Sequence, residues 1–476
     1  MTITSIDYVL FSTLALVVYY SIPRRPQNIW LLLVSYIFVI TWDWNFAVLL
    51  GAITVINFLI APRLRVNGQG RRGMLFVGIG INVFTLVCFR LANFFLPELE
   101  ALLGRLGILT QAGGLQILLP LGISYYVLQI ISYQVDVYRG QTIAEDDFVD
   151  FALYLAYFPK IIAGPIERAR SFLPKLAQPR VVDNQVIARS LVLIFVGLVR
   201  KLLIADLLTG TMLPDVFEFP AKYNPPELMI WLVIYAFALY NDFAGYTDMV
   251  RGVSGLFGIE LSANFRIPYF SRSFTDFWRR WHITLSEWLR DYIYFPLSRY
   301  LSRLYPGPGS LANLVLPPMV TMLISGLWHG FTLHMLLWGG LHGLYLIMER
   351  ISALWRPVPS PASQPVWKQW LGMGSVFVFV LLAWVPFRWE LPAALEFWSA
   401  LLNWSSFDIR YRRLFLVLPI LFVALLIDYL QYRTKDEFVF LKWPRLARAV
   451  FMAVIMFLVI IVTGGDFKDP FIYQAF

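Results

Sequence analysis

Cysteine, histidine and charged residues are all scarce in this chain of 476 residues. Its one cysteine, Cys88, excludes an intramolecular disulfide and a metal site built from several cysteines. Charged residues make up 14% of the chain, whereas soluble domains carry about a quarter. So few charges cannot cover a water-facing surface of this size, which excludes an ordinary soluble protein. The chain also lacks a linker that would separate soluble domains, and it lacks the internal repeat typical of inverted-repeat transporters.

Apolar residues are what the chain has in abundance, at 59% of all positions. They occur in blocks long enough to cross a bilayer, which takes about 20 residues as a helix. Shorter apolar stretches at 29–41 and 150–163 would span, tilt or re-enter. We therefore expect a polytopic membrane protein with about ten to twelve membrane elements, and the first block retained rather than cleaved as a signal peptide. The long blocks are 6–22, 46–61, 74–89, 116–134, 186–208, 227–246, 314–350, 372–388, 414–430 and 449–463.

The net charge of +9 is concentrated in short loops between apolar blocks, around residues 24–25, 63–72 and 442–448. This is the pattern of cytoplasmic loops under the positive-inside rule, and it argues against a nucleic-acid partner. Placing these loops in the cytoplasm puts the N-terminus and residues 464–476 on the outer side of the membrane. The arginines at 410–413 would then also lie outside, against the rule.

Segment 264–300 differs from the rest of the chain because it mixes arginines with aromatic residues. Cations beside interfacial aromatics are typical of a helix in the headgroup region or of the lining of a polar cavity. Both interpretations remain open from the residues alone. The members of this set are Arg266, Arg272, Arg279, Arg280, Arg290 and Arg299 with Phe277, Trp278, Trp281, Trp288, Tyr292 and Tyr294.

Three of the four histidines, His329, His334 and His342, lie in apolar sequence, where an ionisable residue by default marks function. His329 lies between two glycines in ISGLWHG (324–330), so a substrate or another backbone could approach it closely. Histidine is the usual general base near neutral pH, but a buried imidazole that bridges two helices is an equally good interpretation. We interpret His334 as structural. The spacing of the histidines supports no zinc site, so no metal is expected.

Asp242 and Asp248, in LYNDFAGYTDM, are further ionisable residues inside an apolar block. A proton relay or an ion site is one interpretation. Helices held together through hydrogen bonds to these carboxylates are the other, and the residues favour it slightly.

Several longer motifs resemble those of the membrane-bound O-acyltransferases (MBOAT), in particular the bacterial branch with the alginate O-acetylation and teichoic-acid D-alanylation membrane proteins. The resemblance covers nearly the whole chain. It implies an all-α fold, a ring of tilted transmembrane helices around a central catalytic tunnel, in one domain over residues 1–476. The motifs are PLGISYYVLQIISYQVDVYRG at 120–140, YFPKIIAGPIER at 157–168, NDFAGYTDM at 241–249, NFRIPYFSRSFTDFWRRWHITLSEWLRDYIY at 264–294, ISGLWHG at 324–330 and WGGLHG at 338–343.

The resemblance also implies roles for single residues. His329 corresponds to the catalytic histidine of the family. His282 corresponds to a second histidine, in the RRWH motif, which is also expected to be catalytic, and His342 corresponds to the histidine of WGGLHG. Family members take an acyl group from a cytoplasmic thioester, either acetyl-CoA or an acyl carrier protein, and bind no cofactor. In alginate-type systems the acetyl group passes to a periplasmic SGNH-type acetyltransferase. From charge alone, Arg279, Arg280 and Arg290 are candidates to bind the phosphates of CoA.

The last six residues, FIYQAF at 471–476, are similar to a C-terminal FIYxxF motif of bacterial members, whose tyrosine is thought to carry the acyl group. Here that residue is Tyr473. Many alginate-type members end in FIYFQF, so Gln474 and Ala475 depart from that ending while the spaced aromatic residues are kept. A disordered terminus is the alternative, but four apolar or aromatic residues out of six are unusual for disorder.

Together these features predict an O-acetyltransferase of the bacterial inner membrane that acts on an exported polysaccharide such as alginate, beside the polysaccharide synthesis and export machinery. D-alanyl or other acyl transfer to teichoic acid, peptidoglycan or cellulose is the alternative among enzymes, and the tyrosine motif carried in the same chain favours acetyl transfer. A proton-coupled transporter using Asp242, Asp248 and His329, or a scaffold for an export complex, are the alternatives of another class.

Overall fold

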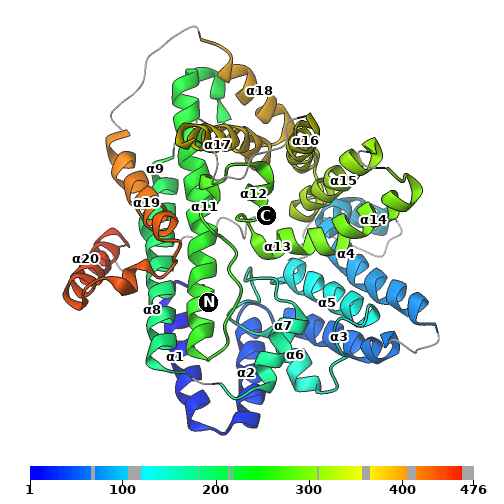
Figure 1. Cartoon of the computed structure of the whole chain (residues 1–476). Helices are drawn as coiled ribbons and strands as arrows, with labels where there is room; N and C mark the ends of the chain where they lie inside the picture. Colours follow the sequence, from blue (N-terminus) through cyan, green and yellow to red (C-terminus); the bar gives the residue numbers. More distant parts are fainter. Residues whose placement is uncertain are drawn as a thin grey trace. The chain divides into compact units, whose positions relative to one another are not determined.

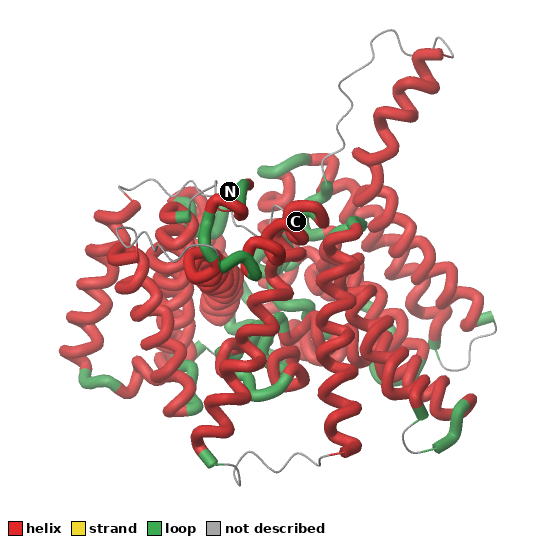
Figure 2. Tube along the Cα trace, turned by 90° about the horizontal axis from the view of Figure 1, so that it is seen from above, coloured by secondary structure: helices red, strands yellow, loops and turns green. Residues whose placement is uncertain are grey.

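The computed structural model describes residues 1–65, 70–105, 119–180, 182–212, 216, 218–307, 310–355, 365–404 and 414–463. Within these ranges the regular structure is helical, with no strand, as the tube in Figure 2 shows. The predicted all-α class is confirmed. The chain divides into two compact units, the first formed by Ile6–Val181 with Phe257–Ile259 and the second by Val182–Leu256 with Glu260–Phe476.

The first unit contains seven α-helices among the residues described, with the 3-10 turn η1 (Ala61–Leu64) between the third and the fourth. Helix α6 packs against α2, α3 and α7, while α4 packs against α5. The helices are α1 (Ile6–Ser21), α2 (Arg24–Ile40), α3 (Trp44–Ile60), α4 (Arg71–Arg105), α5 (Ile123–Tyr138), α6 (Phe148–Ala156) and α7 (Ala169–Ala177).

Local sequence explains where these helices begin and what joins them. The carboxylates of Asp43 and Asp147 accept backbone N–H groups of α3 and α6, which stabilises both N-termini. Inside the unit, the buried amide of Asn82 donates to the Oδ1 atom of Asn57 at 2.8 Å and so links α4 to α3. The side chain of Gln134 on α5 donates to the same oxygen. Such amide pairs join helices where lipid offers no hydrogen bonds.

The stretch after α6 is buried although it is not helical. The Nζ atom of Lys160 donates to the Gln129 Oε1 atom at 2.7 Å and to the Tyr154 carbonyl at 2.6 Å. Gly122, at φ 68°, lies against this stretch, and a Cβ atom there would come within 1.9 Å of the Ile161 carbonyl oxygen. Irregular backbone at membrane depth is tolerated where protein surrounds it. The apolar block 150–163 therefore forms one short helix and a buried loop.

The second unit is built around the long helix α11 (Pro225–Leu256), which runs alongside α8 (Asn184–Leu198) in Figure 1. Glycines permit this close packing, because a Cβ atom on Gly245 would lie 2.7 Å from the Gly197 carbonyl oxygen. The π-helix η2 (Val199–Ala205) continues α8 into α9 (Asp206–Thr211). Block 186–208 is therefore α8, η2 and the start of α9 rather than one regular helix.

The remaining helices of the second unit are short between residues 268 and 304 and longer and more apolar after residue 311. The short helices and the π-helix η5 carry the arginine-rich motif, and α15 and α16 pack side by side (Figure 1). They are α12 (Phe274–Trp278), α13 (Ile283–Leu289), η5 (Arg290–Tyr294), α14 (Phe295–Leu304), α15 (Leu311–His329), α16 (Leu333–Trp355), α17 (Val366–Arg388), α18 (Leu391–Leu401), α19 (Leu414–Thr434) and α20 (Arg445–Thr463), with the 3-10 turns η3 (Pro220–Lys222), η4 (Pro268–Phe270) and η8 (Val439–Lys442).

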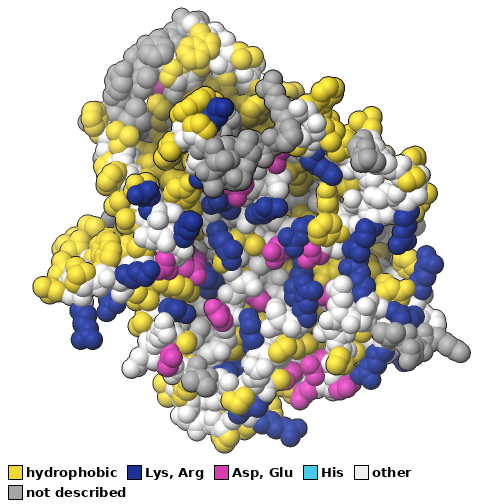
Figure 3. Space-filling model, in the orientation of Figure 1, with side chains coloured by type: hydrophobic (Ala, Val, Ile, Leu, Met, Phe, Trp, Pro, Cys, Tyr) yellow, Lys and Arg dark blue, Asp and Glu magenta, His cyan; other side chains and the backbone are white. Residues whose placement is uncertain are grey.

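Six helices within the described ranges are long and apolar enough to cross a membrane, namely Trp44–Leu64, Arg71–Ala92, Pro225–Leu256, Leu311–His329, Val366–Arg388 and Val417–Thr434. The chain is therefore a multi-pass membrane protein, and the count of ten to twelve membrane elements stays a prediction. Large apolar side chains are exposed along α1, α3 and α20, as expected where lipid is the solvent. In Figure 3, apolar side chains cover much of the surface at the position that α20 has in Figure 1.

Candidate active site

His329 is the last residue of α15, and its side chain is only 5% exposed. The following residue, Gly330, is extended, so the helix ends directly after the imidazole. The other flanking glycine, Gly326, is covered by α16, because a Cβ atom there would lie 2.3 Å from the Met335 carbonyl oxygen. The sequence predicted that either a substrate or another backbone could approach closely beside His329. At Gly326 the approaching group is the backbone of α16. The close contact between α15 and α16 therefore fixes the position of the His329 imidazole relative to α16.

Three aromatic rings from three helices surround the His329 imidazole. The ring centroids of Trp328, Trp338 and Phe387 lie 4.8, 5.1 and 5.2 Å from it, and each ring meets it edge to face. Large, stiff side chains of this kind fix an imidazole and exclude water from it. The sequence drew attention to the histidine and left these rings unassigned, although Trp328 and Trp338 lie inside the quoted motifs.

His282 lies in the same cluster, since its ring is 6.0 Å from that of Trp328 and 4.9 Å from that of Phe243. Its backbone is left-handed, at φ 42°, and it forms the N-cap of α13. A non-glycine residue in this region is strained and is held by its surroundings. Burial lowers the pKa of the His282 imidazole to about 3, so this ring is neutral at physiological pH.

Backbone contacts around Asn264 hold this strained turn. The Ile283 N–H donates to the Asn264 carbonyl at 2.8 Å, and the Thr284 hydroxyl donates to the Asn264 Oδ1 atom at 2.7 Å. The motif NFRIPYF thus reaches across to the start of α13. The carboxylate of Glu349 on α16 accepts the N–H groups of Phe274 and Thr275, which fixes α12 against α16. The arginine-rich motif is positioned by these contacts.

His342, one turn after Trp338 on α16, is completely buried. Its ring contacts those of Trp278 and Trp338, both at 5.0 Å, and stacks on Phe277 at 6.0 Å. Trp338 therefore contacts His329 on one side and His342 on the other. His334 differs from these three histidines, since its Nδ1 atom lies 2.9 Å from the Pro386 carbonyl oxygen.

Two of the three arginines that are candidates to bind the phosphates of CoA form ion pairs with carboxylates. Arg280 pairs with Asp276 at 2.8 Å, and Arg290 pairs with Asp291 at 3.0 Å. Arg279 is exposed. Partly exposed ion pairs of this kind are weak and exchange readily, so a phosphate could displace the carboxylates. Their role toward CoA stays a prediction.

Tyr473 and the rest of segment 464–476 lie outside the described residues.

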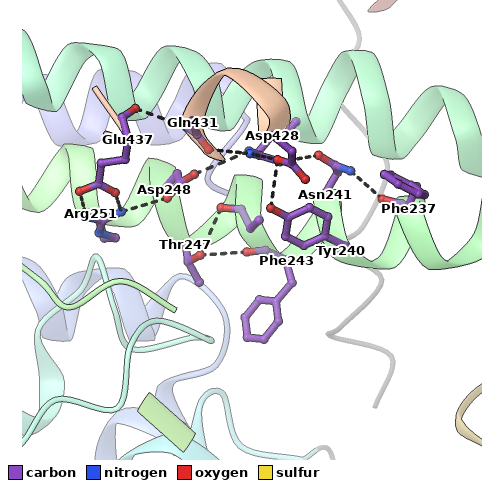
Figure 4. A network of polar contacts seen from close by, with 12 residues as sticks. Phe237, Tyr240, Asn241, Phe243, Thr247, Asp248, Arg251, Asp428, Gln431 and Glu437 are labelled. Carbon is purple, nitrogen blue, oxygen red and sulfur yellow. Dashed lines mark hydrogen bonds and ion pairs between the residues drawn. The ribbon is translucent and has the colours of Figure 1, made fainter. Parts of the chain in front are cut away.

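Asp248 takes part in a network of buried charges that joins α11, η2 and α19 (Figure 4). The Arg200 guanidinium binds Asp428 at 2.7 Å and lies 3.9 Å from Asp248. Arg251 binds Asp248 at 3.1 Å and Glu437 at 3.0 Å. These ion pairs connect helices far apart in the sequence.

Asp242 binds the Lys201 ammonium group at 2.8 Å, and Asp206 binds the same group at 2.7 Å. Arg200 and Lys201 are neighbours in the π-helix η2, whose residues are all buried, and each of them binds aspartates. Both aspartates of the NDFAGYTDM motif thus hold helices together through ion pairs in this structure. Breaking a buried ion pair is costly, so the network stabilises the packing of α11, η2 and α19.

Comparisons with known proteins show the family to which the chain is related. A model of the membrane-bound O-acyltransferase family matches residues 143–388, which include His282, His329 and His342. A probable alginate O-acetylase of Azotobacter vinelandii is 36% identical over 414 residues, or 85% of this chain and 79% of the relative. A peptidoglycan O-acetyltransferase of Helicobacter pylori is 31% identical, over 77% of this chain and 71% of the relative. A teichoic acid D-alanyltransferase of Streptococcus thermophilus is 27% identical, over 56% and 68%.

Proposed function

Because this chain belongs to the membrane-bound O-acyltransferase family, we propose that it moves an acetyl group from acetyl-CoA across the bacterial inner membrane for the O-acetylation of an exported polysaccharide such as alginate. That it is a multi-pass membrane acyltransferase follows from the family and from its six apolar helices. The observation that carries the proposal is His329, a buried imidazole held by three aromatic rings at the end of a membrane helix. The relatives named as alginate O-acetylases supply the class of acceptor.

The first step uses His329 as a general base. Its imidazole takes the phenolic proton of Tyr473, and the phenolate oxygen attacks the thioester carbonyl carbon. The carbon–sulfur bond breaks, and the CoA thiolate leaves and takes up the proton that the imidazolium holds. The products are the acetyl-tyrosine ester and free CoA. The tail of thirteen residues from 464 to 476 would span on the order of 40 Å when extended, more than half of a bilayer core.

The second step passes the acetyl group outward, to a hydroxyl group of a periplasmic SGNH-type acetyltransferase and then to the polysaccharide. A thiol has a pKa of about 8.5 and a phenol of about 10, so the two are comparable leaving groups. Transfer from the thioester to tyrosine is therefore nearly balanced. Transfer from the phenol ester to an alkyl hydroxyl is downhill.

The sequence predicts His282 as a second catalytic residue, and we propose that it acts beside this centre as a positioning residue. Its ring contacts Trp328, and Trp328 contacts His329. Because the His282 imidazole is neutral, it adds no charge next to the proton that His329 accepts. Arg279, Arg280 and Arg290 are proposed to bind the phosphates of CoA.

The proposal is tested in cells that produce the polysaccharide and lack the chromosomal copy of this gene. Complementation with wild type should restore O-acetyl groups, measured on the purified polymer. His329→Ala should lower acetylation about 10² to 10⁴-fold, as expected for a lost general base. His334→Asn is the matched control, because its side chain contacts the Pro386 carbonyl rather than the site, and it should retain acetylation. Normal acetylation by well-expressed His329→Ala would overturn the proposal.

Peptidoglycan is a second candidate acceptor, supported by the relative from Helicobacter pylori. The same strains decide between the two, because acetyl groups would then appear on the cell wall and not on the exported polymer. D-alanyl transfer predicts alanine esters instead. A proton-coupled transporter predicts transport that requires no thioester, and a scaffold predicts polymer acetylation that does not depend on His329.

A further inference from the structure

Trp278, Trp338 and His342 form a cluster of three mutually contacting rings next to the His329 site. The Trp278 and Trp338 rings each lie 5.0 Å from the His342 ring and 5.9 Å from one another. Helix α12 supplies Trp278, and α16 supplies the other two. His342 and Trp338 are 0% and 1% exposed. These three residues are called the ring triad below.

The polar atoms of the ring triad have no hydrogen-bond partner in the described parts of the chain. They are the Nε1 atoms of both tryptophans and both ring nitrogens of His342. A buried polar group left without a partner costs about 1 to 3 kcal/mol, and native proteins keep few of them. Four such atoms on three contacting rings therefore indicate a binding site for a polar ligand.

The chemistry of these atoms restricts that ligand. Indole N–H groups only donate, whereas a neutral imidazole donates from one nitrogen and accepts at the other. The other rings that contact His342 are those of Phe277, Tyr345 and Trp384, so uncharged aromatic rings surround its imidazole. A charged group would be expensive to bury there. An uncharged group that both accepts and donates fits, and a secondary amide has these properties.

We propose that the ring triad binds an amide of the pantetheine arm of the acyl donor. This inference rests on the proposed function, which supplies a thioester donor. The terminal amide of pantetheine lies five bonds from the thioester carbonyl carbon, on the order of 6 Å. Trp338 contacts both His342 and His329, at 5.0 and 5.1 Å between ring centroids. An amide held by the ring triad therefore places the thioester beside His329.

Two small thioesters of equal length test the proposal with purified protein. S-acetyl-N-acetylcysteamine contains the amide, and S-pentyl thioacetate has two methylene groups in place of the amide N–H and C=O. For wild type, kcat/KM for each thioester and the binding of free N-acetylcysteamine are measured. In His342→Phe, which keeps an aromatic ring and removes both nitrogens, KM for the amide thioester and Kd for N-acetylcysteamine should rise about tenfold. The values for S-pentyl thioacetate should stay within about twofold, which also shows that the variant is folded.

Trp278→Phe should also raise KM for the amide thioester and Kd for N-acetylcysteamine, because it removes one hydrogen-bond donor and keeps an aromatic ring. Tyr345→Phe is the matched control, since it removes a hydroxyl group from a ring that contacts His342 but lies outside the ring triad. It should keep the wild-type preference for the amide. If His342→Phe and Trp278→Phe also keep that preference, or if wild type shows none, the amide site is overturned. Triad-dependent binding of N-acetylcysteamine without any acetyl transfer would instead uphold the site and overturn the proposed function.

Discussion

Trp328 connects the two histidines that the sequence singled out most strongly. It contacts His329 at 4.8 Å and His282 at 6.0 Å between ring centroids. The histidines could be singled out in the sequence because only four occur in the chain. Tryptophan is common here, at 17 residues, so its abundance hid the rings that hold the site. The candidate catalytic residue could be predicted from the sequence, whereas its enclosure depends on the contacts of α15, α16 and α17.

His282→Asn should lower the rate of acetyl transfer without changing how the rate depends on pH between pH 5.5 and 8.5. Burial depresses the pKa of His282 to about 3, so its imidazole takes up no proton in this window in the folded protein. The loss should be smaller than the roughly 10² to 10⁴-fold cost of removing a general base. Rates of the purified enzyme at each pH give the measurement. A shifted acid limb in His282→Asn would show that His282 itself titrates during the reaction.

Tyr473→Phe should abolish transfer to the outer acceptor, because it keeps the ring and removes only the hydroxyl oxygen that would carry the acetyl group. Acetylation of the polymer is the measurement. In a strain without the periplasmic partner, mass spectrometry of the wild-type C-terminal peptide should find one added acetyl group. If Tyr473→Phe transfers acetyl like wild type, the tail has a docking role instead.

At the scale of elements, the buried ion pairs between α11, η2 and α19 determine how firmly the second unit is held. The Arg200 side chain is 3% exposed, and its guanidinium lies 2.7 Å from the Asp428 carboxylate. Asp428→Asn removes the negative charge of that partner. Breaking a buried pair in this way costs about 3 to 5 kcal/mol. We expect a clearly lower midpoint of thermal unfolding in detergent. Asp242 and Asp248 were singled out in the sequence as ionisable groups, whereas Asp428 was not. The π-helix that contains Arg200 and Lys201 has no signal in the sequence.

Glu437→Gln provides the matched comparison, since this carboxylate binds Arg251 at 3.0 Å but is 42% exposed. Solvent screens this partly exposed carboxylate, so removing it should lower the midpoint less than Asp428→Asn does, although its partner Arg251 is buried. Equal shifts in Asp428→Asn and Glu437→Gln would contradict the account of the network.

For the molecule as a whole, composition alone predicted the class. A charged fraction of 14% and apolar blocks of membrane length lead to a polytopic membrane protein, and six apolar helices in the described part of the chain confirm it. The blocks 186–208 and 150–163 were predicted less well, because one contains a π-helix and the other ends in a buried loop held by Lys160. Hydropathy reports how apolar a stretch is. It does not report where packing against a neighbour interrupts the helix.

The central claim is that this membrane protein consumes a thioester through His329, and purified protein in detergent tests it most directly. With acetyl-CoA as donor, the release of free CoA thiol is followed for wild type, His329→Ala and His334→Asn. We predict release by wild type and by His334→Asn, and a rate about 10² to 10⁴-fold lower in His329→Ala. Equal release by wild type and a folded His329→Ala variant would contradict the account.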